Sequence, residues 1–183
     1  MLKIGITGNI ASGKSMLEEI IANSGYMVID LDIISHKLLE KECKYEVLKE
    51  FNTTNRKELG KIVFADKNKL KKLENIIHPK LRNYILNFFE ENKNEKAVFI
   101  SGALIYNAGF DDLFDKIIFV DANKELRLKR LIKRNFYDEK TALMRIEAQN
   151  NTFKNRADFI VENNTTKENL KKETLKVLSQ IKL

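Results

Sequence analysis

The fold is decided by residues 8–15, which read Gly8-Asn9-Ile10-Ala11-Ser12-Gly13-Lys14-Ser15. This stretch matches the pattern G-x-x-x-x-G-K-[ST] at every specified position. An apolar run at Lys3–Thr7, typical of a buried strand, comes immediately before it. A helix is expected to begin near Lys14, with Leu17, Ile20 and Ile21 at helical spacing, and to stop at Gly25, where a left-handed cap suits glycine.

A loop of this kind binds phosphate. Glycine at both ends lets the backbone turn so tightly that successive N–H groups point inward at phosphate oxygens, and the positive end of the helix dipole adds to the attraction. Lys14 is expected to bridge the terminal phosphates, and Ser15 to offer its hydroxyl to Mg²⁺. The alternative, a chance Gly-rich turn, is disfavoured because motif and context agree. The residues expected to bind ATP here are Gly8, Asn9, Ile10, Ala11, Ser12, Gly13, Lys14, Ser15 and Met16.

Further apolar runs predict the rest of an α/β fold. Four more strands are expected at Met27–Leu31, Ala97–Ser101, Lys116–Asp121 and Phe159–Glu162, and helical patterns separate them. Strands that alternate with helices predict a three-layer fold around a five-stranded, mainly parallel sheet. The predicted core comprises about residues 1–32, 93–122 and 152–183.

Two helical segments interrupt that core. Residues of about 33–92 exceed what a crossover needs, so they predict a helical substrate-binding insertion, with Leu81, Tyr84, Ile85, Phe88 and Phe89 at helical spacing. Phe51 and Phe64 are expected in the core with Phe88 and Phe89. A helical pair at about Asn123–Arg134 and Asp138–Asn151 predicts a lid. The last helix is expected to start with the capping box Thr165-x-x-Glu168 and to bury Leu170, Val177, Leu178 and Ile181.

Composition limits the function classes. The chain has one cysteine, Cys43, and two histidines, His36 and His78, so neither an internal disulfide nor a histidine-cysteine metal cluster is expected. No apolar run is long enough to span a membrane and no secretory signal is evident, which predicts a cytoplasmic protein. The net charge of +7 suits an anionic ligand, although lysine-rich stretches such as KNKLKKLEN are typical of solvated helix faces.

The second strand ends in Ile29-Asp30-Leu31-Asp32. The carboxyl ends of parallel strands gather around the ligand crevice, so a carboxylate there can orient or deprotonate an acceptor hydroxyl. Asp30 and Asp32 point to the same side as long as the strand remains extended. The alternative is that Asp32 caps the following helix.

Taken together, these segments resemble the dephospho-CoA kinase family. The resemblance rests on IGITGNIASGKS, VIDLDIISHKLL, RKELGKIVFADKNKLKKLENIIHPKL, LKRLIKRN, RIEAQ and ADFIVENN, which occur in order from residue 2 to about 164. The loop alone is common to many nucleotide enzymes, but the combination is selective. It implies a P-loop kinase that phosphorylates the ribose 3′-hydroxyl of dephospho-coenzyme A with ATP and magnesium.

The resemblance also implies roles for individual residues, most of them outside the loop. Asp32 is the expected catalytic base, with Lys14 and Arg134 as further catalytic residues and Arg130 at ATP. His78 and Arg82 are possible substrate contacts, although a structural role for His78 and surface charge for Arg82 are the plainer interpretations. His78 precedes the chain's only proline, Pro79, which predicts a turn before the next helix.

Departures from the family pattern concern other positions. Ala103 and Asn107 stand where the family shows a proline and a glutamate, and Thr165 stands where it shows a glycine.

Two rival functions remain open from the sequence. One is a P-loop kinase of another small metabolite or nucleoside monophosphate; the other is a non-catalytic nucleotide-dependent protein that binds nucleic acid. The charge suggests the second, and the lack of aromatic residues among the arginines of residues 124–134 argues against it. We expect ATP and dephospho-CoA as partners, no membrane or nucleic acid, and a monomer or weak homo-oligomer.

Overall fold

The computed structural model describes residues 1–149 and 151–182. They form two compact units: Met1–Ile29 together with Asn94–Leu183, and Asp30–Lys93. None of the helices in the described ranges has the length and apolar character that a membrane crossing requires.

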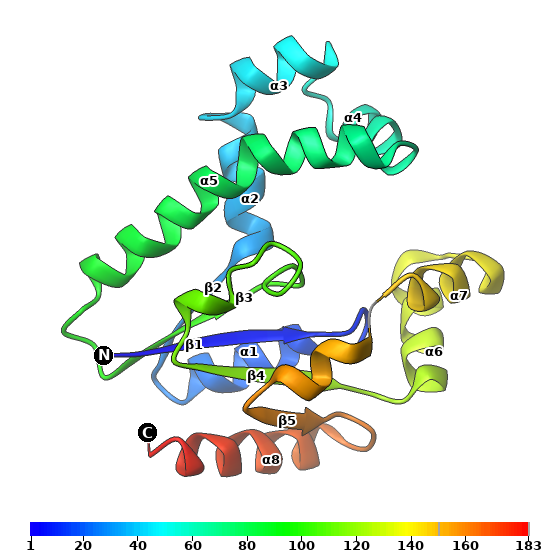
Figure 1. The fold of residues 1–183 in the computed structure, drawn as a ribbon. Coiled ribbons are helices and arrows are strands. Elements are labelled where there is room, and N and C mark those ends of the chain that lie inside the picture. Colours follow the sequence, from blue (N-terminus) through cyan, green and yellow to red (C-terminus); the bar gives the residue numbers. More distant parts are fainter. Residues whose placement is uncertain (150, 183) are drawn as a thin grey trace. The chain divides into compact units, whose positions relative to one another are not determined.

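The first unit is built on a five-stranded sheet with the order β2-β3-β1-β4-β5 (Figure 1). Strand β1 pairs in parallel with β3 and β4, and β4 pairs in parallel with β5. All five strands lie where the sequence predicts them, except that β1 is one residue longer at each end and β2 ends one residue earlier, at Asp30. The strands are β1 (Leu2–Gly8), β2 (Met27–Asp30), β3 (Ala97–Ser101), β4 (Lys116–Asp121) and β5 (Phe159–Glu162).

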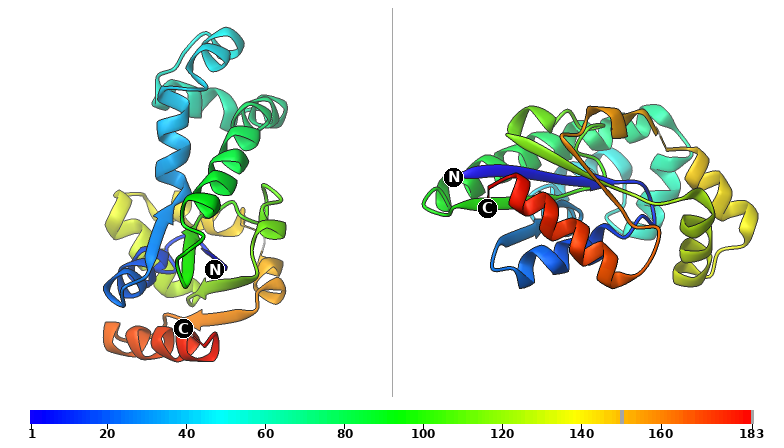
Figure 2. Two further views of the ribbon diagram at one scale, coloured as in Figure 1. Left: turned by 90° about the vertical axis from the view of Figure 1, so that its left-hand side faces the viewer. Right: turned by 90° about the horizontal axis from the view of Figure 1, so that it is seen from below.

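Helices α1 (Lys14–Asn23) and α8 (Lys167–Gln180) lie side by side against one face of this sheet (Figure 2). Their apolar stripes form one core with the strands, in which Leu17 and Leu170 are almost completely buried. Strand β4 leads into α6 (Lys124–Asn135) and then α7 (Glu139–Glu147), which pack on each other (Figure 1). The unit also contains 3₁₀ turns at Asp111–Leu113 and Asn151–Arg156. Asn150, inside the predicted second lid helix, lies outside the described residues.

The predicted start of the last helix is wrong by one residue. Thr166, not Thr165, is the N-cap, and its side-chain oxygen accepts a hydrogen bond from the amide of Asn169 at 3.2 Å. The backbone at Thr166 is extended, so helical geometry begins at Lys167 and the box with Glu168 does not form as predicted. The predicted apolar face is confirmed, with Leu170, Val177 and Leu178 buried and Ile181 packed against the core.

The second unit is entirely helical. It comprises α2 (Leu31–Glu40), α3 (Lys44–Phe51), α4 (Arg56–Phe64) and α5 (Lys67–Glu91), and each of the first three packs on α5. Side-chain caps fix two of the helix starts, because Asn55 and Asp66 accept hydrogen bonds from the first-turn amides of α4 and α5. The buried stripe of α5 consists of Leu73, Ile77, Leu81, Ile85, Phe88 and Phe89.

Two predictions for this unit are wrong. Helix α5 continues through Pro79 instead of ending in a turn before it. Proline has no N–H, so the helix forgoes a hydrogen bond to Asn75 at a cost of about 3 kcal/mol, and burial of Ile77 and Leu81 on either side offsets that loss. Phe64, expected in the core, is the last residue of α4 and is 82% exposed.

Candidate functional site

Both glycines that the loop motif specifies are required by close approaches in the first unit. A Cβ at Gly8 would lie 2.4 Å from the carbonyl oxygen of Val120. Gly13 has φ of +100°, and a Cβ there would lie 2.1 Å from Nδ2 of Asn163. The loop therefore folds as a tight turn at the N-terminus of α1, which only glycine at these positions permits.

Arg130 and Asn163 fix the backbone of the phosphate loop through hydrogen bonds to its carbonyl groups. Arg130 donates from Nη1 to the carbonyl oxygens of Ala11 and Ser12, at 3.4 and 3.3 Å, and from Nη2 to the carbonyl of Asn163 at 2.9 Å. The side chain of Asn163, only 3% exposed, donates to Ser12 O at 2.8 Å. The C=O and N–H of a trans peptide point in opposite directions, so this brace turns the N–H of Gly13 away from Asn163 and Arg130. Such an amide is available to a phosphate oxygen.

A second anchor holds the start of the loop. Asp121, at the carboxyl end of β4, accepts hydrogen bonds from Asn9 Nδ2 at 3.2 Å and from Lys154 Nζ at 2.7 Å. The bond to Asp121 raises the pKa of Lys154, so the lysine stays charged. Arg127 on α6 is 5% exposed, and its burial lowers the pKa of its guanidinium while the charge of Asp121 opposes that shift. Asp121 thus joins the loop to the Asn151–Arg156 turn.

Lys14 lies at the carboxyl end of the central strands. Its Nζ donates to Ser101 Oγ at 2.7 Å and to Glu18 Oε1 at 2.8 Å. Ser15, the next residue on α1, is exposed, so its hydroxyl faces solvent at the helix N-terminus. The ammonium and hydroxyl groups that the motif predicts are therefore both presented beside the loop amides.

Two residues of the predicted lid, Arg130 and Gln149, form hydrogen bonds with the phosphate loop. Gln149 Oε1 accepts a hydrogen bond from the amide of Ile10 at 2.6 Å. Arg134 is exposed at the end of α6, where its Nε donates to Asn135 Oδ1 at 3.0 Å. Of the two predicted lid arginines, the structure brings Arg130 to the loop and leaves Arg134 outside it.

Sequence reasoning missed the loop contacts of Asn163 and Gln149. Both residues stand in the segments that carry the family resemblance, ADFIVENN and RIEAQ, which was the signal available. Nothing in the local pattern shows that either side chain bonds to the loop backbone.

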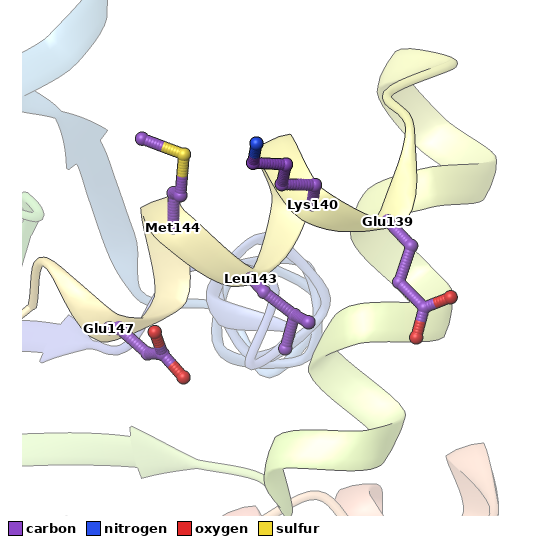
Figure 3. A pocket seen from close by; sticks show the side chains of 5 residues that line it. All are labelled: Glu139, Lys140, Leu143, Met144 and Glu147. Atoms are coloured by element: carbon purple, nitrogen blue, oxygen red, sulfur yellow. The ribbon is translucent and has the colours of Figure 1, made fainter.

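A surface hollow lies on α7, apart from the loop contacts described above. It is lined by residues of that one helix, namely Glu139, Lys140, Leu143, Met144 and Glu147 (Figure 3). Glu147 at its end pairs with Lys124 of α6 at 2.8 Å. The hollow brings together none of the loop residues, so we assign it no part in the phosphate site.

The second unit carries the remaining predicted residues. Asp30 caps α2 by accepting a hydrogen bond from Asp32 N at 2.7 Å, and Asp32 is exposed in the first turn. The helix begins at Leu31, so the strand does not remain extended to Asp32 and the condition for the two carboxylates to share one side is not met. The alternative that Asp32 is the cap is wrong, because the cap is Asp30. His78 and Arg82 lie one turn apart on α5, and burial lowers the pKa of His78, partly opposed by Glu74.

A parallel sheet with a phosphate-binding loop after its central strand is the architecture of the P-loop kinases. The same fold occurs in shikimate kinase from Bacteroides thetaiotaomicron, with a TM-score of 0.57 at 16% identity over 100% of this chain and 99% of that one. The chain therefore has the P-loop kinase fold, as the sequence predicts.

Within that class, the family model for dephospho-CoA kinase matches residues 2–169, so the chain belongs to the dephospho-CoA kinase family. A dephospho-CoA kinase of Listeria innocua is 37% identical over 94% of this chain and 93% of its own. The solved dephospho-CoA kinase from Campylobacter jejuni is 32% identical, with a TM-score of 0.73 over 98% of this chain and 96% of that one. The predicted family and fold are confirmed, and with them the prediction of a transferase that phosphorylates dephospho-CoA with ATP in the last step of coenzyme A biosynthesis.

Proposed function

We propose that this chain transfers the terminal phosphoryl group of ATP to the ribose 3′-hydroxyl of dephospho-coenzyme A, with residues 8–16 as the triphosphate site. The observation that carries the proposal is the braced loop. Arg130 and Asn163 form hydrogen bonds with carbonyl groups of the loop. The loop amides at the N-terminus of α1, together with Lys14, are then left to bind the triphosphate. Converging amides and an ammonium group stabilise the charge of a transferring phosphoryl group.

Magnesium fits this site as a companion of ATP. In the described residues, no three His, Cys, Asp or Glu side chains are grouped so that they could hold a metal ion by themselves. Mg²⁺ bound with nucleotide keeps several waters and takes most other ligands from the phosphates, so one or two protein oxygens suffice. Ser15 would supply one through its exposed hydroxyl. When bound, the ion would neutralise charge that develops on the phosphate oxygens.

Asp32 is our proposed base. Its carboxylate is exposed in the first turn of α2, where the hydrogen bond that the Asp32 N–H donates to the Asp30 carboxylate fixes the backbone. A carboxylate there would accept or orient the proton of the acceptor hydroxyl. The helical unit of residues 30–93 would bind dephospho-CoA, with His78 and Arg82 of α5 among its contacts, and Arg134 would act on the phosphates from the lid. We also propose that the enzyme works in the cytoplasm as a monomer or weak homo-oligomer.

The test is mass spectrometry of the product formed from dephospho-CoA, ATP and Mg²⁺, run beside a panel of other hydroxylated acceptors. Asp32→Asn should lower turnover by about 10²- to 10⁴-fold with ATP affinity nearly unchanged. The matched control is Glu168→Gln, another exposed first-turn carboxylate, on α8, which should keep parental turnover. If Asp32→Asn stayed within a few-fold of the parent, Asp32 would not be the base.

A further inference from the structure

One carboxylate at the phosphate loop is not part of the motif. Glu18 lies one helical turn after Lys14 on α1, and the side chains of both are 15% exposed. Its Oε1 accepts from Lys14 Nζ at 2.8 Å and also from the hydroxyl of Ser101. Lys14 Nζ in turn donates to Ser101 Oγ at 2.7 Å, so the three side chains form a closed triangle.

The triangle lies at the carboxyl end of the strand beside the loop. Ser101 is the last residue of β3, opposite Ile6 of β1, and is completely buried. In P-loop enzymes an aspartate usually shares the magnesium ion with the loop serine. Here the strand ends in a hydroxyl, and the nearby carboxylate comes from the helix.

We infer that Glu18, held in place by Ser101, supplies the carboxylate of the magnesium-phosphate site of this kinase. The inference rests on the proposal that ATP and Mg²⁺ bind at residues 8–16. It assigns to α1 a role that a strand-end aspartate has in other P-loop enzymes. Whether Glu18 binds the ion directly or through one of its waters, its charge lies on the same side of the loop as Lys14.

Charge balance is the physical reason to expect a magnesium ion beside Glu18. When Lys14 turns to the terminal phosphates of ATP, Glu18 loses its cation and remains a mostly buried carboxylate beside a triphosphate. Ser101 remains its hydrogen-bond donor, but a mostly buried charge that has lost its counter-ion is costly, and the approaching phosphates add repulsion. A divalent cation that arrives with the nucleotide removes both penalties, because it attracts the carboxylate and the phosphates together.

The competing explanation is that Glu18 only holds Lys14 until nucleotide binds. The two explanations differ in how binding depends on magnesium. If Glu18 is only a holding partner, its neutralisation frees Lys14 and leaves the effect of Mg²⁺ on ATP affinity unchanged. If Glu18 belongs to the magnesium site, its neutralisation reduces that effect and does not weaken ATP binding without metal.

The experiment measures the Kd of ATP by calorimetry in EDTA and in saturating Mg²⁺, for the parent and for Glu18→Gln. We expect the affinity gain from Mg²⁺ to fall by about 10- to 100-fold in Glu18→Gln, while the Kd in EDTA is unchanged or lower. The matched control is Glu19→Gln, the exposed neighbour on the same helix, which should keep the parental gain.

A second variant places the carboxylate at the end of strand β3 instead of on α1. The double variant Glu18→Gln with Ser101→Asp should recover part of the magnesium gain, with circular dichroism as the check that it folds. Paramagnetic Mn²⁺ binding in the presence of ATP gives a readout independent of turnover. A Glu18→Gln protein whose magnesium gain stays within twofold of the parent overturns the inference. A parent that binds no ATP in either condition overturns the proposed function instead.

Discussion

Substitution of Gly13 by alanine tests the brace of the phosphate loop, and the chain provides its own control. Gly13 and Gly25 both have positive φ, +100° and +90°. A Cβ at Gly25 meets nothing within 4 Å, whereas a Cβ at Gly13 would lie 2.1 Å from Asn163 Nδ2. Gly13→Ala must therefore displace the Asn163 side chain, and Gly25→Ala need not displace anything.

The expected magnitudes follow from this difference. Left-handed backbone costs an alanine roughly 1–2 kcal/mol, and this applies to both variants. Gly13→Ala also breaks the buried bond of 2.8 Å from Asn163 to Ser12 O, which costs about 1–3 kcal/mol more. If that extra loss falls on the loop conformation that binds phosphate, ATP affinity drops by about 5- to 150-fold in Gly13→Ala. Gly25→Ala should leave ATP affinity unchanged.

The assay is urea denaturation for the free energy of unfolding, with calorimetry for ATP binding. A double-mutant cycle with Asn163→Ala isolates the clash, because without the Asn163 amide Gly13→Ala should cost only the backbone strain. We expect a coupling energy of about 1–3 kcal/mol between the two sites. The reasoning would be refuted if Gly13→Ala and Gly25→Ala lost equal amounts of unfolding free energy and of ATP affinity, and if the coupling energy between Gly13 and Asn163 were near zero.

Three further outcomes are expected. Gln149→Glu should weaken ATP binding by about tenfold at low salt, because a carboxylate on the amide of Ile10 repels the phosphates; calorimetry at two salt concentrations checks this, and tighter binding would contradict it. Burial lowers the folded-state pKa of His78 below its ordinary 6.5, so its contribution to stability is complete above that pH and is lost as the pH falls. His78→Gln should therefore flatten the fall of the stability profile below about pH 6.5 in denaturation titrations, and an unchanged slope would oppose this assignment. Phe64→Ser should change the free energy of unfolding by less than about 0.5 kcal/mol, whereas Phe89→Ala, 3% exposed in the parent, should cost about 3–5 kcal/mol; the two denaturation midpoints decide.

The phosphate loop could be predicted from the sequence because its requirements are local. The turn needs glycine at Gly8 and Gly13, the helix N-terminus follows directly, and Lys14 and Ser15 occupy fixed positions in its first turn. The strands were predictable for a similar reason, since a strand buried on both faces appears as a short apolar run. Family membership followed from several such segments in order.

Predictions failed where two local signals competed. A proline usually ends a helix, yet α5 continues through Pro79 because burial on both sides of it outweighs one lost hydrogen bond. Phe64 is apolar and helical, but the buried stripe of α4 is formed by Leu59 and Val63 instead. Thr165 and Thr166 are equally good caps by composition, and only the backbone geometry selects the second.

The sequence by itself determined that this chain has a phosphate-binding loop, a parallel α/β core and the dephospho-CoA kinase pattern. Only the tertiary structure decided which polar side chains hold that loop. Arg130 and Arg134 are one turn apart with the same charge, and it is the position of α6 after β4 that brings one of them to the loop carbonyls. Asn163 and Glu18 likewise meet their partners, Ser12 and Ser101, across 151 and 83 residues of chain. The physical reason is that local spacing fixes the direction of a backbone amide within its own turn, whereas contacts across the sheet depend on how strands pair and helices pack.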